Sequence, residues 1–223
     1  MAKKKSRFLK QQKLFIGVGT LVVVAILAYF MTLVITEVPL GDFVAGEHYD
    51  VLENPRRIRG DEIEVMEFFS YGCAACNRFD PMIEGWVEEN AVAVKFVRSP
   101  MPSSESWRLL ARHYFTMVKL GLEEQHHVDF FSAIHDRQLN LSTPARLISW
   151  AEDNQIEGYQ EAFESDGVRR RLTSSDEMSR RYQVVSVPTL MVHGKYIVKP
   201  TSTIGQARML DVLDHLIETK LVP

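Results

Sequence analysis

Cysteine is scarce in this sequence, whose 223 residues include only Cys73 and Cys76, separated by two alanines. A disulfide between them closes a very short loop, and loop-closure entropy assigns it only about 2 kcal/mol of stabilisation. This excludes a scaffold that depends on many disulfides. The pair is better explained as reactive than as structural.

Acidic residues are missing from the first 36 positions, which form two adjoining stretches. Residues 1–13 contain no acid and six basic side chains, and residues 14–36 contain no charged residue at all. As a helix, the second stretch is about 34 Å long and can cross the ~30 Å hydrocarbon core of a bilayer. A cleaved signal peptide is the alternative, but its apolar region is usually shorter, roughly 7–15 residues. We expect an uncleaved single-pass anchor at 14–36, with residues 1–13 in the cytoplasm and residues 37–47 as a tether.

Basic residues are in the minority beyond residue 13. Six of the 26 basic side chains lie before that point, so 20 remain against 29 acidic ones. Nucleic-acid binding depends on neutralising phosphates with Lys and Arg, so no nucleic-acid partner is expected. Internal repeats and low-complexity segments are also lacking, and the remaining length suits one folded domain.

Hydrophobic spacing predicts an α/β protein. A strand at 62–69, a helix at 76–90 and a strand at 91–98 form a βαβ unit around the cysteine pair. A β-hairpin at 189–192 and 196–198 and a helix at 204–220 end the chain. Helical patterns fill the interval between the two β-regions, at residues 106–120, 128–137, 144–150, 157–165 and 168–182.

The position of the cysteines suggests thiol chemistry. A thiol attacks only as the thiolate, and Cys73, at the start of the predicted helix, can be stabilised by unpaired backbone N–H groups and the helix dipole. Cys73 would then form a mixed disulfide with a partner, which Cys76 resolves. A zinc site is the alternative, but it needs two more Cys or His ligands. The only histidine cluster is His126-His127, whose side chains point in different directions, so no metal is expected.

Two further residues have two possible explanations each. Pro188 precedes a β-run, where it fits either as a cis peptide after Val187 or as an ordinary trans proline at a strand start. Glu67 lies inside an apolar strand, where burial would raise its pKa and let it accept or relay the proton of Cys76. Alternatively, Glu67 lies at a strand end open to solvent.

These motifs resemble the DsbA family of bacterial thiol:disulfide interchange proteins. The resemblance rests on the run from Glu67 to Cys76 (EFFSYGCAAC), on Ser186-Val187-Pro188-Thr189 and on the VHGKY run at 192–196, and it covers roughly residues 46–220. It implies a thioredoxin fold at 48–101 and 184–223 with a helical domain inserted at 102–183, all preceded by the transmembrane helix.

The same resemblance implies roles and surroundings. Cys73 is the nucleophile, Cys76 the resolving thiol and Glu67 a buried acid, and the cis peptide Val187-Pro188 contacts the substrate backbone. The redox-active disulfide needs no other cofactor. The protein is expected in the bacterial inner membrane with its catalytic domain in the periplasm. Its partners would be reduced or misoxidised exported proteins and either a DsbB-like membrane thiol oxidase or a reductant.

One departure from the family bears on the direction of electron flow. Strongly oxidising members carry Pro-His between the cysteines, whereas this chain has Ala74-Ala75, which offers the Cys73 thiolate no side-chain donor. We expect a disulfide donor. The alternatives are a reductase or isomerase that uses the same pair, and a tethered chaperone with little redox turnover.

Overall fold

The computed structural model describes residues 22–26, 43–60 and 62–221, and the chain divides into two units, Met1–Asp42 and Phe43–Pro223. In the first unit, residues 22–26 are helical. No helix among the described residues is both long and apolar enough to cross a membrane. The predicted segment 1–13, most of the anchor and residues 37–42 of the tether lie outside the described residues.

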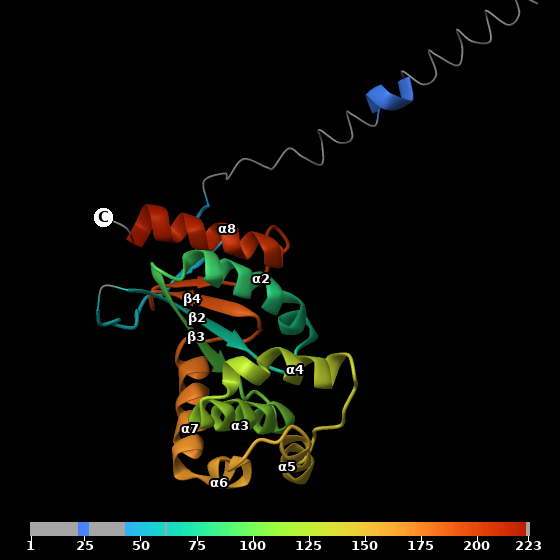
Figure 1. Ribbon diagram of the computed structural model, residues 1–223. Helices are drawn as coiled ribbons and strands as arrows, with labels where there is room; N and C mark the ends of the chain where they lie inside the picture. Colours follow the sequence, from blue (N-terminus) through green and yellow to red (C-terminus); the bar gives the residue numbers. More distant parts are fainter. Residues whose placement is uncertain (1–21, 27–42, 61, 222–223) are drawn as a thin grey trace, which may run out of the picture. The chain divides into compact units, whose positions relative to one another are not determined.

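The second unit contains a five-stranded mixed sheet with the order β1-β5-β4-β2-β3 (Figure 1). β2 and β3 are parallel, whereas the β2–β4, β4–β5 and β1–β5 pairs are antiparallel. The strands are β1 (Asp50–Val51), β2 (Ile63–Phe69), β3 (Val94–Pro100), β4 (Thr189–Val192) and β5 (Tyr196–Val198). The predicted βαβ unit and hairpin are both confirmed.

Side chains of β2 alternate between the two faces of the sheet, and both faces are covered by hydrophobic clusters. Met66 and Phe68 pack with Met191 on one face. Val65 and Phe69 point to the other face, the face of α2 (Ala74–Asn90). Glu67 is two residues from both Val65 and Phe69, and side chains two apart on a strand point to the same face, so its carboxylate also faces α2.

Helix α8 (Gln206–Leu216) packs against α2 over the sheet, and a π-helical turn, η1 (Ile217–Leu221), ends it (Figure 1). Buried apolar side chains of both helices share one hydrophobic cluster with the sheet. The indole Nε1 of Trp86 donates to Asp214 Oδ1 at 2.7 Å and joins the two helices. This contact links α2, which begins at the cysteine pair, to α8.

Helices α3 to α7 lie between β3 and β4 in the chain and pack mainly on one another. Their bounds are α3 (Glu105–Leu120), α4 (Glu123–His135), α5 (Pro144–Asp153), α6 (Tyr159–Glu164) and α7 (Asp166–Arg181). The five predicted helices are therefore confirmed, although α4 begins five residues earlier than expected. Whether they form a domain with limits at 102 and 183 remains a prediction.

Candidate active site

Cys73 is the N-cap residue of α2, with φ −99° and ψ 109°. Its Sγ accepts the backbone N–H of Cys76 at 3.2 Å, so the sulfur fills the capping position that usually belongs to Ser or Asp. Both cysteines are free thiols in this structure. The expected placement of Cys73 at the positive end of a helix is thus confirmed.

The surroundings of Cys73 stabilise its thiolate. The pKa of Cys73 is lowered from 9.0 to about 6, first by the hydrogen bond from the Cys76 thiol and then by backbone N–H groups of Cys76 and Ala75 and the charge of Arg78. Partial burial opposes this shift but does not cancel it. At neutral pH, Cys73 is therefore largely ionised when the pair is reduced.

Cys76 has the opposite environment. It is fully buried on α2, whereas Cys73 retains 9% of its surface. Burial raises the pKa of Cys76 far above its ordinary value, and the neighbouring Cys73 and Glu67 raise it further. The two sulfurs, one helical turn apart, thus differ strongly in acidity, which allows one to stay ionised while the other stays protonated.

The peptide between Val187 and Pro188 is cis, as the family resemblance implies. The loop before β4 lies beside the cysteine pair, where the Val187 carbonyl oxygen is 3.5 Å from Cys73 Sγ and accepts a hydrogen bond from the protonated thiol. Pro188 is buried and Val187 is partly buried. Contact of these residues with a substrate backbone remains a prediction.

Glu67 is buried, with 2% of its surface exposed, so the alternative of a solvent-open strand end is wrong. Burial raises the pKa of Glu67 to about 8, although Arg98 opposes the shift. Arg98 stands opposite Glu67 in the parallel register of β2 and β3 and donates Nε to Glu67 Oε2 at 3.3 Å. At neutral pH this carboxyl group is largely protonated and can supply a proton.

Sequence reasoning missed the polar side chains behind Glu67. Arg98 also donates to Asp80 Oδ1 at 3.3 Å and to Glu84. Asp80 is buried on α2 and accepts from His127 of α4 as well. Its place one helical turn after Cys76 was the available signal, because residues four apart share a helix face.

Gln206 was also missed. It is the first residue of α8, and its side-chain amide donates to the Ala75 carbonyl oxygen at 2.8 Å. This bond holds the dipeptide between the cysteines from outside α2. Nothing in the local sequence signals it, because the partners lie 131 residues apart.

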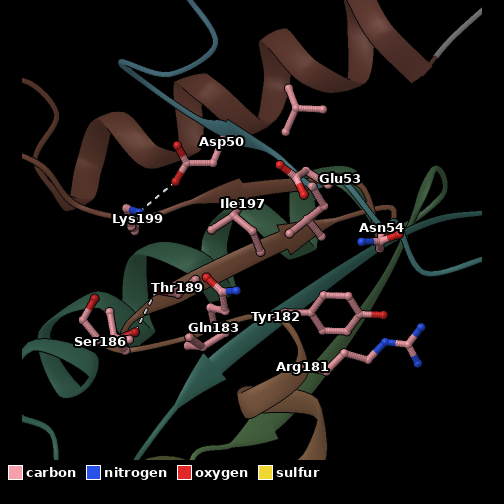
Figure 2. Close-up of a pocket in the computed structure, with 14 residues that line it drawn as sticks. Asp50, Glu53, Asn54, Arg181, Tyr182, Gln183, Ser186, Thr189, Ile197 and Lys199 are labelled. Atoms are coloured by element: carbon pink, nitrogen blue, oxygen red, sulfur yellow. Dashed lines mark hydrogen bonds and ion pairs between the residues drawn. The ribbon is translucent and has the colours of Figure 1, made fainter.

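A cavity of about 400 Å³ lies beside β1, β5 and the segment after α7 (Figure 2). Its lining includes the Asp50–Lys199 ion pair and Ser186, whose carbonyl oxygen accepts from the Thr189 hydroxyl at 2.8 Å. Neither cysteine is among its 14 lining residues. The redox chemistry therefore belongs to the α2 N-terminus, and this cavity borders it only through the residues on either side of Val187 and Pro188.

The chain is similar in sequence to known proteins. The chain is 31% identical to the thiol:disulfide interchange protein DsbA of Pseudomonas aeruginosa over 180 residues, which cover 79% of this chain and 85% of that relative. The chain belongs to the DsbA family. A DsbA from Burkholderia cepacia is 28% identical over 178 residues, covering 78% of this chain and 84% of the relative. A scan against protein-family models finds no match.

Solved DsbA structures agree with the fold. The crystal structure of P. aeruginosa DsbA matches with a TM-score of 0.75 and 31% identity, over 80% of this chain and 95% of that one. The oxidoreductase DsbA of Xylella fastidiosa matches with a TM-score of 0.72 and 25% identity, over 79% and 96% of the two chains. The DsbA-like thioredoxin fold is confirmed, and the chain is a protein thiol-disulfide oxidoreductase.

Proposed function

We propose that this DsbA-family protein donates disulfides to exported proteins through Cys73 and Cys76. The observation that supports this direction most strongly is the unequal acidity of the two sulfurs. An ionised, stabilised Cys73 favours the reduced form of the pair, so the oxidised form readily gives its disulfide away. No cofactor beyond this disulfide is needed.

Donation takes two exchange steps. A thiolate of the reduced substrate attacks Cys73 Sγ, the disulfide to Cys76 breaks, and a mixed disulfide forms. A second substrate thiolate then attacks the substrate sulfur of that bond and releases Cys73 as the thiolate. The substrate loses two electrons and gains a disulfide, and the pair is left reduced.

Glu67 supplies a proton in the first step. Cys76 leaves as a thiolate in a buried place that strongly disfavours its charge. Glu67, with a pKa of about 8, is largely protonated at neutral pH and can neutralise that sulfur. When the pair is reoxidised, the carboxylate takes the proton back, so the same group acts as acid and then as base.

Val187 and Pro188 form the substrate contact. The Val187 carbonyl oxygen lies against Cys73 Sγ, so a polypeptide whose cysteine attacks Cys73 must pass beside it. A backbone N–H group of that substrate can donate a hydrogen bond to the Val187 carbonyl oxygen, as the N–H group of a strand added to a sheet would. Such main-chain recognition suits an enzyme that acts on many exported sequences.

Residues 14–36 anchor the protein in the bacterial inner membrane in this account. The uncharged run is long enough, and the six basic residues before it favour a cytoplasmic N-terminus. The catalytic domain then faces the periplasm, after a tether that ends near residue 47. A DsbB-like membrane thiol oxidase reoxidises the pair by accepting its two electrons. Fractionation of the full chain and of a variant lacking residues 14–36 tests the anchor, and loss of membrane association only in the variant is expected.

The Ala74-Ala75 dipeptide favours a second candidate, a reductase or isomerase. These side chains give the thiolate no donor, and a less stabilised thiolate makes a weaker oxidant. A partner that supplies electrons would then hold the pair reduced. A chaperone without redox turnover is the remaining candidate, and retention of biological function in Cys73→Ser would favour it.

Incubating the oxidised protein with a reduced two-cysteine peptide separates these candidates. A disulfide donor converts one equivalent of peptide to its disulfide and becomes reduced, and the Cys73→Ser variant does not. Thiol trapping in intact cells is the complementary measurement. A mostly oxidised pool supports donation, whereas a mostly reduced pool supports the reductase.

A further inference from the structure

Helix α4 makes two hydrogen bonds to Tyr71, one to its side-chain hydroxyl and one to its backbone carbonyl. The Tyr71 hydroxyl lies 2.8 Å from His127 Nδ1, and the Tyr71 carbonyl oxygen accepts from His135 Nε2, also at 2.8 Å. The two histidines are eight residues apart on α4, just over two turns, so they approach from the same side of the helix. Tyr71 is 2% exposed and precedes Cys73 by two residues.

The His127 contacts have a defined direction. Burial lowers the pKa of His127, which keeps its imidazole neutral with one N–H group. Nε2 lies 2.9 Å from Asp80 Oδ1, and a carboxylate can only accept. Nε2 therefore donates a hydrogen bond to Asp80, and Nδ1 accepts one from the Tyr71 hydroxyl.

These bonds extend the polar chain of the active site. Asp80 also accepts from Arg98, and Arg98 donates to Glu67. This series of hydrogen-bonded side chains thus runs from Glu67, whose charge acts on Cys76, to Tyr71, which lies two residues before Cys73. Glu67 and Tyr71 therefore belong to one network of side chains, to which helix α4 contributes His127.

A second element of the same helical group fixes the residue between Tyr71 and Cys73. A side-chain Cβ at Gly72 would lie 2.8 Å from Trp107 Nε1 of α3, so α3 packs directly on the loop backbone. The loop is thus enclosed by α3 and α4, which pack on each other (Figure 1). Its position relative to α2 decides whether Cys73 Sγ meets the backbone N–H of Cys76.

We propose that His127 and His135 are positioning residues of the redox site, which place the Cys73 sulfur at the α2 N-terminus by holding Tyr71. Neither histidine is within the hydrogen-bonding shell described for that sulfur. They act through the loop, so helix α4, outside the βαβ unit, tunes the reactivity of the pair. This inference rests on the proposed function, in which Cys73 is the nucleophile.

Packing alone is the competing explanation. The centroid of the Tyr71 ring lies 4.6 Å from that of Phe130 and 4.8 Å from that of Phe131, so the ring contributes to the core without its hydroxyl. Tyr71→Phe keeps this ring packing and removes only the bond to His127. The variant therefore separates a positioning role from a packing role.

The test compares full-length Tyr71→Phe, His127→Phe and the double variant with the wild type. The pH dependence of Cys73 alkylation gives its titration midpoint, and equilibration with glutathione gives the redox equilibrium constant. We expect each single change to raise the midpoint by about half a unit or more, a roughly threefold fall in the ratio of thiolate to thiol at a given pH. Because both changes break the same hydrogen bond, the double variant should add little.

Matched controls come from α4 itself. His126→Phe alters the neighbouring histidine, which has no contact with Tyr71 in the described hydrogen bonds, and should leave the midpoint and the equilibrium constant unchanged. His135→Gln retains a donor for the Tyr71 carbonyl and should stay closer to wild type than His135→Phe. Unfolding curves are recorded for every variant.

Unchanged midpoint and equilibrium constant in Tyr71→Phe and His127→Phe, with lowered stability alone, would overturn the proposal in favour of packing. If His127→Phe does not fold, Tyr71→Phe decides by the same criteria. The wild type separates this outcome from failure of the proposed function. A wild-type Cys73 that titrates near 9.0 contradicts the function itself, whatever the variants do.

Discussion

Glu67 and Arg98 stand directly opposite each other in the parallel register of β2 and β3, and Arg98 Nε donates to Glu67 Oε2 at 3.3 Å. The ion pair does not keep Glu67 ionised, because burial raises its pKa to about 8 despite the nearby guanidinium. Arg98 is shared with Asp80 and Glu84, so its charge is divided among three carboxyl groups. As a result, Glu67 is largely protonated at neutral pH and lies near the buried sulfur of Cys76.

Glu67→Gln should change how stability depends on pH. Glu67 has a folded-state pKa of about 8 and an ordinary value of 4.5, so between these pH values the folded state binds more protons than the unfolded state. The stability of the reduced wild type therefore falls as pH rises through this window, by at most about 1.4 kcal/mol per pH unit from this group. Glu67→Gln removes that contribution, and urea unfolding from pH 5 to 8 measures it.

Glu84→Gln is the matched control for Glu67→Gln, because Glu84 contacts the same Arg98 but its side chain is 39% exposed. Its stability should still fall as pH rises through this window, because Glu67 is retained. If the stability of Glu67→Gln falls in the same way, Glu67 does not titrate as described.

Cys76→Ala should raise the pKa of Cys73. The hydrogen bond from the Cys76 thiol is the largest cause of the low Cys73 pKa, and alanine has no donor. Cys76→Ser retains a hydroxyl donor and should restore part of the effect. The pH dependence of iodoacetamide alkylation, read by mass spectrometry, compares the two variants. Equal midpoints for alanine and serine would show that the side-chain bond contributes nothing.

Placing Pro-His between the cysteines, as in Ala74→Pro/Ala75→His, should make the protein more oxidising. A histidine at position 75 adds a donor or a positive charge near the Cys73 thiolate, which the alanine does not provide. Each unit by which the Cys73 pKa falls corresponds to about 30 mV in the two-electron potential. Equilibration with glutathione measures the potential, and the reverse order, Ala74→His/Ala75→Pro, is the control. A potential that is unchanged or more reducing would contradict this account.

Local patterns were enough to predict the β-α-β unit, the hairpin and the placement of Cys73. The errors have local causes. The start of helix α4 at Glu123 was predicted too late because its N-cap, Leu122, makes no side-chain capping bond and so gives no capping signal in the sequence. β3 begins at Val94 because Ala93 N–H bonds to the Asn90 carbonyl oxygen and forms a turn after α2.

The polar chain behind Glu67 could not be predicted from local patterns. Arg98 reaches residues 31 and 18 positions away, and His127 lies 47 positions from Asp80. Such pairs are set by how strands and helices pack, and the spacing of apolar residues does not reveal them. The family resemblance identified Glu67, Cys73, Cys76 and Pro188 but not the residues that support them.

The most direct test of the account is the titration of Cys73 in the reduced, full-length wild type in detergent, followed by the rate of its alkylation against pH. We expect a midpoint near 6, with Cys76 unreactive across the range because it is buried and its pKa is raised. A midpoint near 9.0, or alkylation of Cys76 before Cys73, would contradict it.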